Sequence, residues 1–161
     1  MRLGRRSRDS RGMAIVEFAL VFPLLLLLVF MTIDFGMYFF VQHTIQFATR
    51  EGVRLALVGR TINDDSGNEM TREASIIATI RDKAAVAVKP EDLSISIYPV
   101  DTGYSDPSTW QTTQNAGDPG VYMRVRTRYT YKFVTPFIGA LVSGGSVPIQ
   151  AQATYRNELF D

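Results

Sequence analysis

One stretch of the chain determines most of what it can be: between Met13 and Ile33 the only charged side chain is Glu17. This run of 21 residues would form a helix about 32 Å long, which matches the roughly 30 Å hydrocarbon thickness of a bilayer. A secretory signal has a shorter apolar run and a small-residue cleavage site behind it, and none follows here. The run therefore predicts a membrane-spanning helix.

The residues on either side of the run predict its orientation. Residues 1–12 hold five arginines against one aspartate, and the positive-inside rule places such a segment in the cytoplasm. The arginines that set this topology include Arg5, Arg6, Arg8 and Arg11. Beyond Asp34 comes a group of aromatic residues typical of a membrane interface, namely Phe35, Tyr38, Phe39 and Phe40. We expect a basic leader at 1–12, a transmembrane helix at 13–34 and the rest outside the membrane.

The basic character of the chain comes from its leader. The chain has 17 basic and 16 acidic residues, of which the leader holds five and one, so residues 13–161 carry 12 basic and 15 acidic side chains. Nucleic-acid binding needs a concentrated basic face on the folded part, so we expect no nucleic-acid partner. The chain contains no cysteine, which excludes a thiol nucleophile, a disulfide and a thiolate metal site.

The helix is expected to continue beyond the membrane as a stalk over residues 35–59. Apolar residues recur at roughly helical spacing between Val41 and Val58, and Gly59 suits the position just after a helix C-terminus. One helix from Met13 to Val58 would be about 70 Å long. Pro23 is the place at which its membrane half would kink.

The junction between the leader and the apolar run has a characteristic order of residues. Residues 11–18 are RGMAIVEF: a basic leader, a glycine, four apolar residues, a glutamate and an aromatic residue. This order resembles the processing site of type IV prepilins, in which a membrane-embedded peptidase cuts after the glycine. With AIVEFALVFPLLLLL at 14–28, IDFG at 33–36 and ATREGVRLA at 48–56, the segment resembles more particularly the TadE-like family, the minor pilins or pseudopilins of tight-adherence (Flp, type IVb) pili. Asp34 stands where glutamate is more usual in that pattern.

The resemblance implies a mechanism of assembly. Cleavage after Gly12 would remove the arginines and leave a new α-amine on Met13. Glu17, a costly residue in hydrocarbon, would pair with the Met13 amine of a neighbouring subunit and fix the axial offset between the two helices. The implied partners are the membrane, a prepilin peptidase, other pilin or pseudopilin subunits and the pilus assembly platform. The implied location is the bacterial inner membrane, with the C-terminal head extracytoplasmic.

Residues 60–161 predict a small head of the α+β class. A helix is expected over Glu69–Val86, with Thr71 or Asn68 as its N-cap. Alternation of apolar and polar residues predicts strands at Leu93–Pro99, Val121–Val134 and Val147–Arg156. Strands with one apolar face favour an antiparallel sheet of about three strands packed on one side by the helix.

Two connections in the head differ in character. Asp101–Gly120 is a polar loop whose length is unusual inside a compact domain, and we expect Trp110 to anchor it. Thr135–Ser146 is apolar and rich in glycine. We expect this second loop to pack against the stalk or against a partner.

The head offers no set of residues for catalysis. His43, the only histidine, falls on the stalk and is interpreted as an interfacial polar residue. The acidic loop at 63–69, NDDSGNE, does not follow the EF-hand spacing, so a solvated loop is favoured over a weak calcium site. We expect no enzymatic activity, no cofactor and no metal site.

Basic side chains form a row on the polar face of the strand at Val121–Val134, namely Arg124, Arg126, Arg128 and Lys132. Either the row meets an acidic partner surface or an anionic polymer, or it is the solvated face of the sheet, with arginine stems covering apolar neighbours.

Three functions fit these features. The first is a cleaved minor pilin that displays a small head. The second is an uncleaved, membrane-anchored scaffold of the pilus or secretion machinery that keeps its basic leader. The third is an anchored envelope domain that binds a ligand or catalyses a reaction, and the lack of a nucleophile, base and metal set in the head disfavours it.

Overall fold

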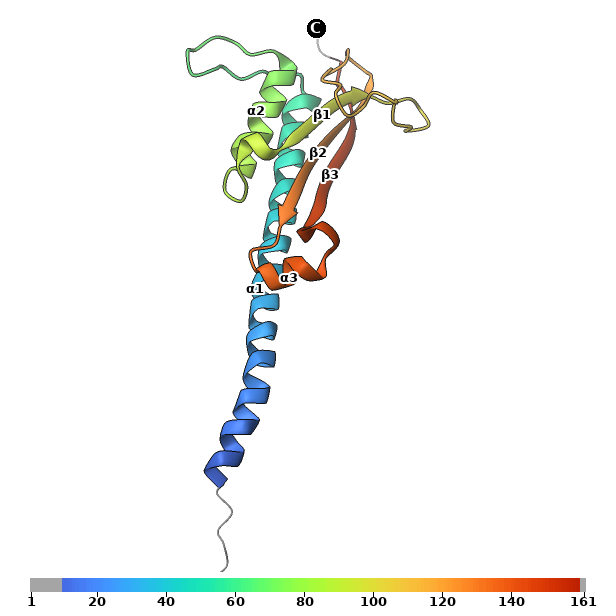
Figure 1. The fold of residues 1–161 in the computed structure, drawn as a ribbon. Coiled ribbons are helices and arrows are strands. Elements are labelled where there is room, and N and C mark those ends of the chain that lie inside the picture. Colours follow the sequence, from blue (N-terminus) through green and yellow to red (C-terminus); the bar gives the residue numbers. More distant parts are fainter. Residues whose placement is uncertain (1–9, 160–161) are drawn as a thin grey trace, which may run out of the picture.

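The computed structural model describes residues 10–159 and shows a long helix with a small α+β head along its C-terminal half (Figure 1). The elements in chain order are α1 (Ser10–Leu57), α2 (Arg72–Ala84), η1 (Pro90–Asp92), β1 (Ser94–Pro99), β2 (Tyr122–Lys132), α3 (Pro136–Leu141), η2 (Ser143–Gly145) and β3 (Ser146–Arg156). The α+β class, the long apolar helix and the three-stranded antiparallel sheet are confirmed.

Helix α1 is continuous over 48 residues and passes through Pro23. At its end Gly59 adopts a left-handed conformation (φ +66°), and its N–H donates to the Ala56 carbonyl over 3.1 Å. A positive φ costs glycine little because it has no Cβ. The single long helix and the role of Gly59 at its end follow the expectation from sequence.

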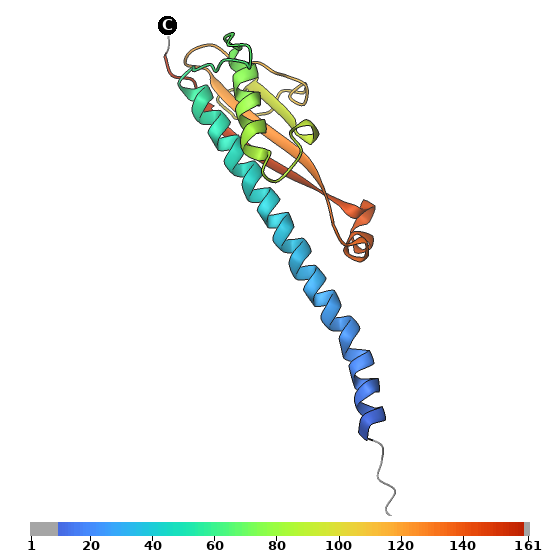
Figure 2. The same cartoon turned by 90° about the vertical axis from the view of Figure 1, so that its left-hand side faces the viewer.

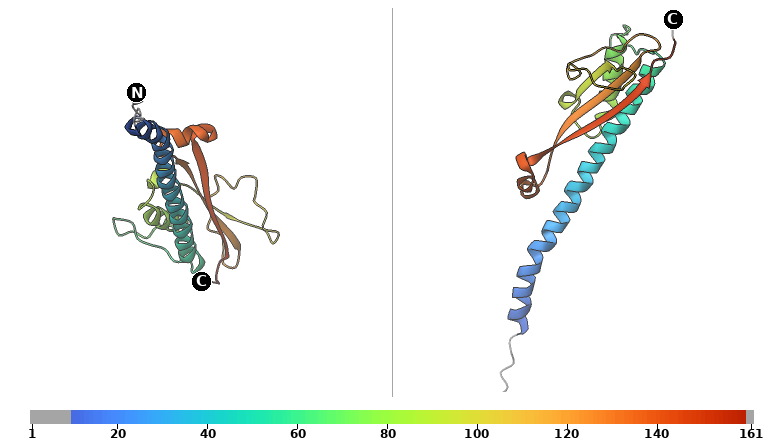
Figure 3. Two further views of the ribbon diagram at one scale, coloured as in Figure 1. Left: turned by 90° about the horizontal axis from the view of Figure 1, so that it is seen from below. Right: turned by 90° about the vertical axis from the view of Figure 1, so that its right-hand side faces the viewer.

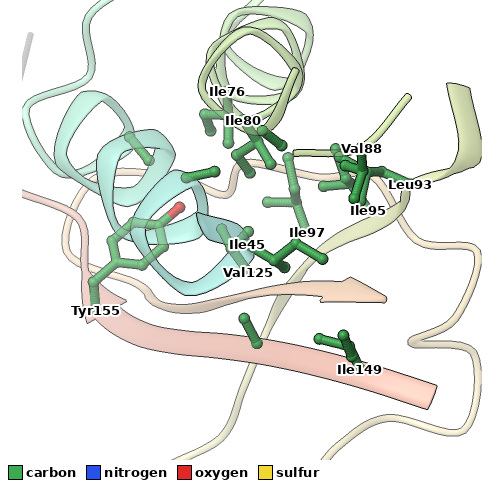
Figure 4. Packing of buried hydrophobic residues seen from close by; sticks show 14 of the residues in the cluster. Ile45, Ile76, Ile80, Val88, Leu93, Ile95, Ile97, Val125, Ile149 and Tyr155 are labelled. Carbon is green, nitrogen blue, oxygen red and sulfur yellow. The ribbon is translucent and has the colours of Figure 1, made fainter. Parts of the chain in front are cut away.

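The C-terminal half of α1 forms one wall of the head core. Its buried apolar residues are Val41, Ile45, Ala48 and Ala56. They join Ile76 and Ile80 of α2 and Ile97, Val125 and Ile149 of the sheet in one cluster (Figure 4). The segment expected as a stalk is therefore built into the head.

Helix α2 lies along the C-terminal half of α1 (Figure 2). It begins after Thr71, whose hydroxyl accepts the Ala74 N–H over 3.2 Å, so one of the two N-caps expected from sequence is observed. Gly52 allows the close approach of the two helices, because a Cβ there would lie 2.5 Å from Cγ1 of Ile80.

The sheet has the order β1-β2-β3, and both pairs are antiparallel. The C-terminal half of α1 packs against α2 on one side and against β2 and β3 on the other (Figure 3). A buried hydrogen bond of 2.9 Å joins the hydroxyls of Thr49 and Thr127 across this contact. The apolar face of each strand therefore points to the helices, as its alternation indicated.

The opposite face of the sheet departs from the expectation, because the long loop at 101–120 folds over it. Asp106 accepts hydrogen bonds from the Tyr98 hydroxyl (2.9 Å), from Nη2 of Arg126 (2.7 Å) and from Nη1 of Arg124. The ring of Trp110 lies 4.2 Å from the Arg126 guanidinium. Trp110 thus anchors the loop, as expected.

The predicted row of exposed basic side chains is therefore corrected. Arg124 and Arg126 are buried, Arg128 is half-buried beneath the loop, and of the four only Lys132 is exposed. Two arginines are buried here because Asp106 supplies a countercharge, Thr154 and Gln152 accept their Nε–H groups, and the Tyr104 carbonyl accepts from Nη2 of Arg124. A buried charge needs such partners.

Candidate functional site: an exposed apolar helix

The N-terminal half of α1 has no cover from the rest of the chain. From Gly12 to Ile33 every residue is exposed except Leu27 and Met31, which are half-buried. This part of α1 projects away from the head (Figure 2). Within residues 10–159, α1 is the one helix long and apolar enough to cross a membrane. An apolar surface of this size marks contact with a membrane or with other proteins.

The residues of the expected processing site lie at the N-terminal end of α1. The bond between Gly12 and Met13 falls in the first turn of α1, where backbone N–H groups lack intrahelical partners. A Cβ built on Gly12 would meet nothing within 4 Å, and Met13 is 70% exposed. Arg11 belongs to the same turn, whereas Arg5, Arg6 and Arg8 lie outside the described residues.

Glu17 is exposed one turn further along the helix. Within the described part of the chain it makes neither an ion pair nor a side-chain hydrogen bond. The carboxylate is thus available to a group outside the chain. If the helix began at Met13, Glu17 would also lie near a new N-terminus, where the helix dipole favours a negative charge.

Asp34 has a role that sequence reasoning missed. It is fully buried, and its carboxylate accepts the backbone N–H groups of Val134 (3.0 Å) and Thr135 (3.1 Å). The Tyr131 hydroxyl donates to its carbonyl over 3.4 Å. Asp34 therefore joins α1 to the connection between β2 and β3, 100 residues later. The sequence holds one signal for this contact, which is that the connection contains no charged residue. A segment of that composition favours contact with an apolar surface such as that of α1.

The aromatic residues after Asp34 mostly face outward. Phe35, Phe39 and Phe40 are about half exposed. Tyr38 instead packs edge-on against Tyr131 at a centroid distance of 5.5 Å. Three of the four residues expected at a membrane interface are therefore on the surface, and the fourth belongs to the head.

The remaining candidate positions show ordinary surface geometry. His43 is exposed on α1. In the loop at 63–69 the Asp64 carboxylate accepts the N–H groups of Ser66 and Asn68, and the Asn68 contact lowers the pKa of Asp64. No group of three or more histidine, aspartate or glutamate side chains placed to hold a metal occurs among residues 10–159.

The comparison with protein families agrees with this location of the site. The model of the family described as "TadE-like protein" matches residues 12–54, which are 43 of the 161 residues. The match includes the exposed half of α1 and most of its buried half. No curated protein and no solved structure matches the chain. Residues 12–54 are therefore similar to a pilin-type structural family that includes minor pilins of tight-adherence pili.

Proposed function

We propose that this chain is a minor pilin, or pseudopilin, of a tight-adherence (Flp, type IVb) pilus assembly system. A prepilin peptidase cleaves it after Gly12, and the product assembles through its N-terminal helix. The observation that carries the proposal is that the TadE-like match includes the whole of the half of α1 that lacks cover within the described chain.

Before assembly the exposed half of α1 is held in the bacterial inner membrane. A helix that is apolar on all sides is stable in hydrocarbon, where its backbone hydrogen bonds are satisfied internally. The leader arginines keep the N-terminus in the cytoplasm, so the head is extracytoplasmic. The same apolar surface can then pack against the helices of other pilin subunits and of the assembly platform.

Glu17 supplies the register of this packing. Cleavage creates a positive α-amine on Met13, about 6 Å along the helix from Glu17. The positive end of the helix dipole disfavours that amine, and a carboxylate from a neighbouring subunit offsets both charges. A pair offset by one turn fixes the axial position of one subunit against the next, which is the best-attested use of a buried ionic group.

The first experiment identifies the N-terminus of the protein by mass spectrometry, in membranes and in sheared surface fractions, with and without the prepilin peptidase. We expect a chain that starts at Met13 only when the peptidase is present. An intact leader in both strains would overturn the pilin mechanism and leave the uncleaved membrane scaffold as the function.

A substitution of Glu17 tests the register. Glu17→Gln should leave insertion and cleavage unchanged but lower incorporation into sheared fibres roughly tenfold to a hundredfold, because a charge-assisted hydrogen bond contributes about 1.5–3 kcal/mol. Glu51→Gln is the matched control, since Glu51 lies on the same helix and forms an ion pair with Arg54 at the surface. Equal incorporation of both variants would contradict the register role.

A further inference from the structure

The connection between β2 and β3 has the composition of a membrane-contacting segment. Residues 133–145, called here the β2–β3 tip, contain no charged side chain and no histidine. The tip includes α3 and η2 and lies at the end of the sheet nearest the exposed half of α1 (Figure 1). The charged Lys132, which is exposed, immediately precedes it.

The tip lies beside the exposed apolar half of α1. Thr135 and Ile138 form one wall of an open, almost entirely apolar groove of about 320 Å³, and the other wall is formed by residues of α1, namely Pro23, Leu26, Leu27 and Phe30. Phe30 and Leu26 lie about 6 and 12 Å along the helix from Asp34, on the side of the expected membrane span. The groove is therefore at hydrocarbon depth if residues 13–34 span a bilayer.

The backbone of the tip suits a medium without water. Val134 and Thr135 donate their N–H groups to the Asp34 carboxylate. Within the tip, Gly139 donates to Thr135, Val142 to Gly139 and Gly145 to Val142, over 2.9–3.2 Å. An unpaired backbone N–H group is costly to remove from water, so these hydrogen bonds lower the cost of bringing the tip into the bilayer interface.

The outer surface of the tip is apolar and uncovered. Val134 is 69% exposed and Leu141 63% exposed. The exposed aromatic residues Phe35, Phe39 and Phe40 of α1 follow Asp34 directly, at the level expected for lipid headgroups. Lys132 borders the tip, where a long cationic side chain can extend to anionic headgroups.

We propose that the β2–β3 tip inserts into the leaflet of the lipid bilayer on the side of the head, as a second membrane contact beside α1. Lipid is the occupant that the structure favours, because the groove is continuous with the membrane-spanning surface of α1 and shares its lack of charge. Interfacial amphipathic helices bury their apolar face about 5–10 Å into a bilayer, comparable with the positions of Phe30 and Leu26 along α1. The inference rests on the membrane anchor of the proposed function.

Two membrane contacts hold the head differently from a single helix. With α1 alone, the head is free to tilt relative to the plane of the membrane. With the tip inserted, the Asp34 contact and the lipid fix which face of the head points toward the bilayer. Assembly into a fibre then requires the tip to leave lipid together with α1.

The absence of cysteine from the chain makes a direct test possible. Full-length single-cysteine variants are reconstituted at low protein density in vesicles of phosphatidylethanolamine and phosphatidylglycerol and labelled with a membrane-impermeant maleimide. Leu141→Cys reports on the tip, Leu24→Cys on the expected span, and Val86→Cys is the matched control, because Val86 is a comparably exposed apolar residue of the head (73%). Labelling in SDS gives the total, and Val86→Cys gives the fraction of heads that face outward.

We expect the Leu141→Cys variant to be labelled roughly tenfold more slowly than Val86→Cys, or slower still, and Leu24→Cys to be protected. A nitrobenzoxadiazole fluorophore on the thiol of Leu141→Cys should be quenched by doxyl-labelled lipids, and the same probe on Val86→Cys should not.

Each other outcome contradicts a different part of the inference. Fast labelling of Leu141→Cys with Leu24→Cys protected would overturn the tip inference and leave the anchor intact. Fast labelling of Leu24→Cys as well would overturn the anchor and with it the proposed function. Protection of Leu141→Cys in fibres but not in vesicles would show that a neighbouring subunit covers the tip, and would also overturn the inference.

Discussion

The two halves of α1 share one backbone but belong to different environments. Residues 13–33 are apolar on every side and almost all exposed, whereas residues 34–57 bury one face, with Asp34, Val41, Ile45, Ala48 and Gly52 at intervals of three to seven residues. A helix that is apolar all round needs cover on all sides, and a helix with one apolar stripe needs a single packing partner. The head supplies that partner for the second half only. The first half takes its stability from outside the chain.

The largest effect should come from removing a core side chain in the buried half. Ile45→Ala should lower the free energy of unfolding of the head by about 2–5 kcal/mol, because Ile45 is fully buried and the substitution leaves a cavity. Urea unfolding of the full chain in detergent micelles measures it. Ile15→Ala, at a site 69% exposed, should change the value by less than about 0.5 kcal/mol. Equal effects would mean that the comparison between the halves is wrong.

The second largest effect is expected from a substitution at Asp34, where the two halves of α1 meet. Asp34→Asn removes a carboxylate that accepts two backbone N–H groups, and such charged hydrogen bonds contribute about 1.5–3 kcal/mol. Amide hydrogen exchange at Val134 and Thr135 should therefore accelerate by roughly tenfold to a hundredfold. The control is Asp82→Asn, because Asp82 pairs with Lys83 on the surface. Unchanged exchange in Asp34→Asn would show that the carboxylate does not hold the tip.

Two glycines sharpen the same comparison, because both lie in residues 34–57 and only Gly52 is on the packed face of α1. Gly52→Ala should destabilise the head by about 1–3 kcal/mol, because the new methyl group would overlap buried Ile80. Gly36→Ala, whose Cβ would meet nothing within 4 Å, should instead add about 0.5–1 kcal/mol of helix stability. Thermal unfolding followed by circular dichroism measures both. A stabilising Gly52→Ala would contradict the close packing of α1 on α2.

The smallest effect is confined to the long loop and depends on pH. Burial raises the pKa of Asp106, but hydrogen bonds from Tyr98, Arg126 and Arg124 lower it by more. The net pKa is therefore below the ordinary value. An aspartate in the unfolded chain has a pKa of about 3.9. The stabilisation is therefore fully present above about pH 4 and is lost as the pH falls through the lower folded pKa. The loop should detach on acidification.

Fluorescence of Trp110, the only tryptophan, reports this detachment directly. An acid titration should show a transition below about pH 4 in the original chain. Asp106→Asn should show an exposed Trp110 already at neutral pH and no such transition. A transition of the same amplitude in both proteins would assign it to another carboxylate.

The elements themselves follow from the sequence because their periods are local. The apolar run and the 3.6-residue spacing behind it predict one helix to within a residue or two of Leu57, and alternation predicts β1, β2 and β3 with similar accuracy. Helix α2 is shorter than predicted, because Glu69 pairs with Asn63 in an isolated bridge before the helix begins. The motif at residues 11–18, on which the proposed processing rests, is likewise a local pattern, so the sequence alone points to Gly12 and Glu17.

Contacts between distant segments had to come from the tertiary structure. Alternation places Arg124 and Arg126 on the polar face of β2. Whether solvent reaches that face depends on the loop at 101–120, which has no regular sequence pattern and brings Asp106 onto it. In the same way Asp34 ends the apolar run in the sequence, while its buried carboxylate is satisfied by N–H groups 100 residues away. The periodicity of a helix or strand determines the face on which a side chain lies. Whether the side chain is buried depends on which other segment packs against that face. The sequence by itself therefore determined the apolar run, the elements and the motif at residues 11–18, and the tertiary structure decided which charges are buried and what holds the tip beside α1.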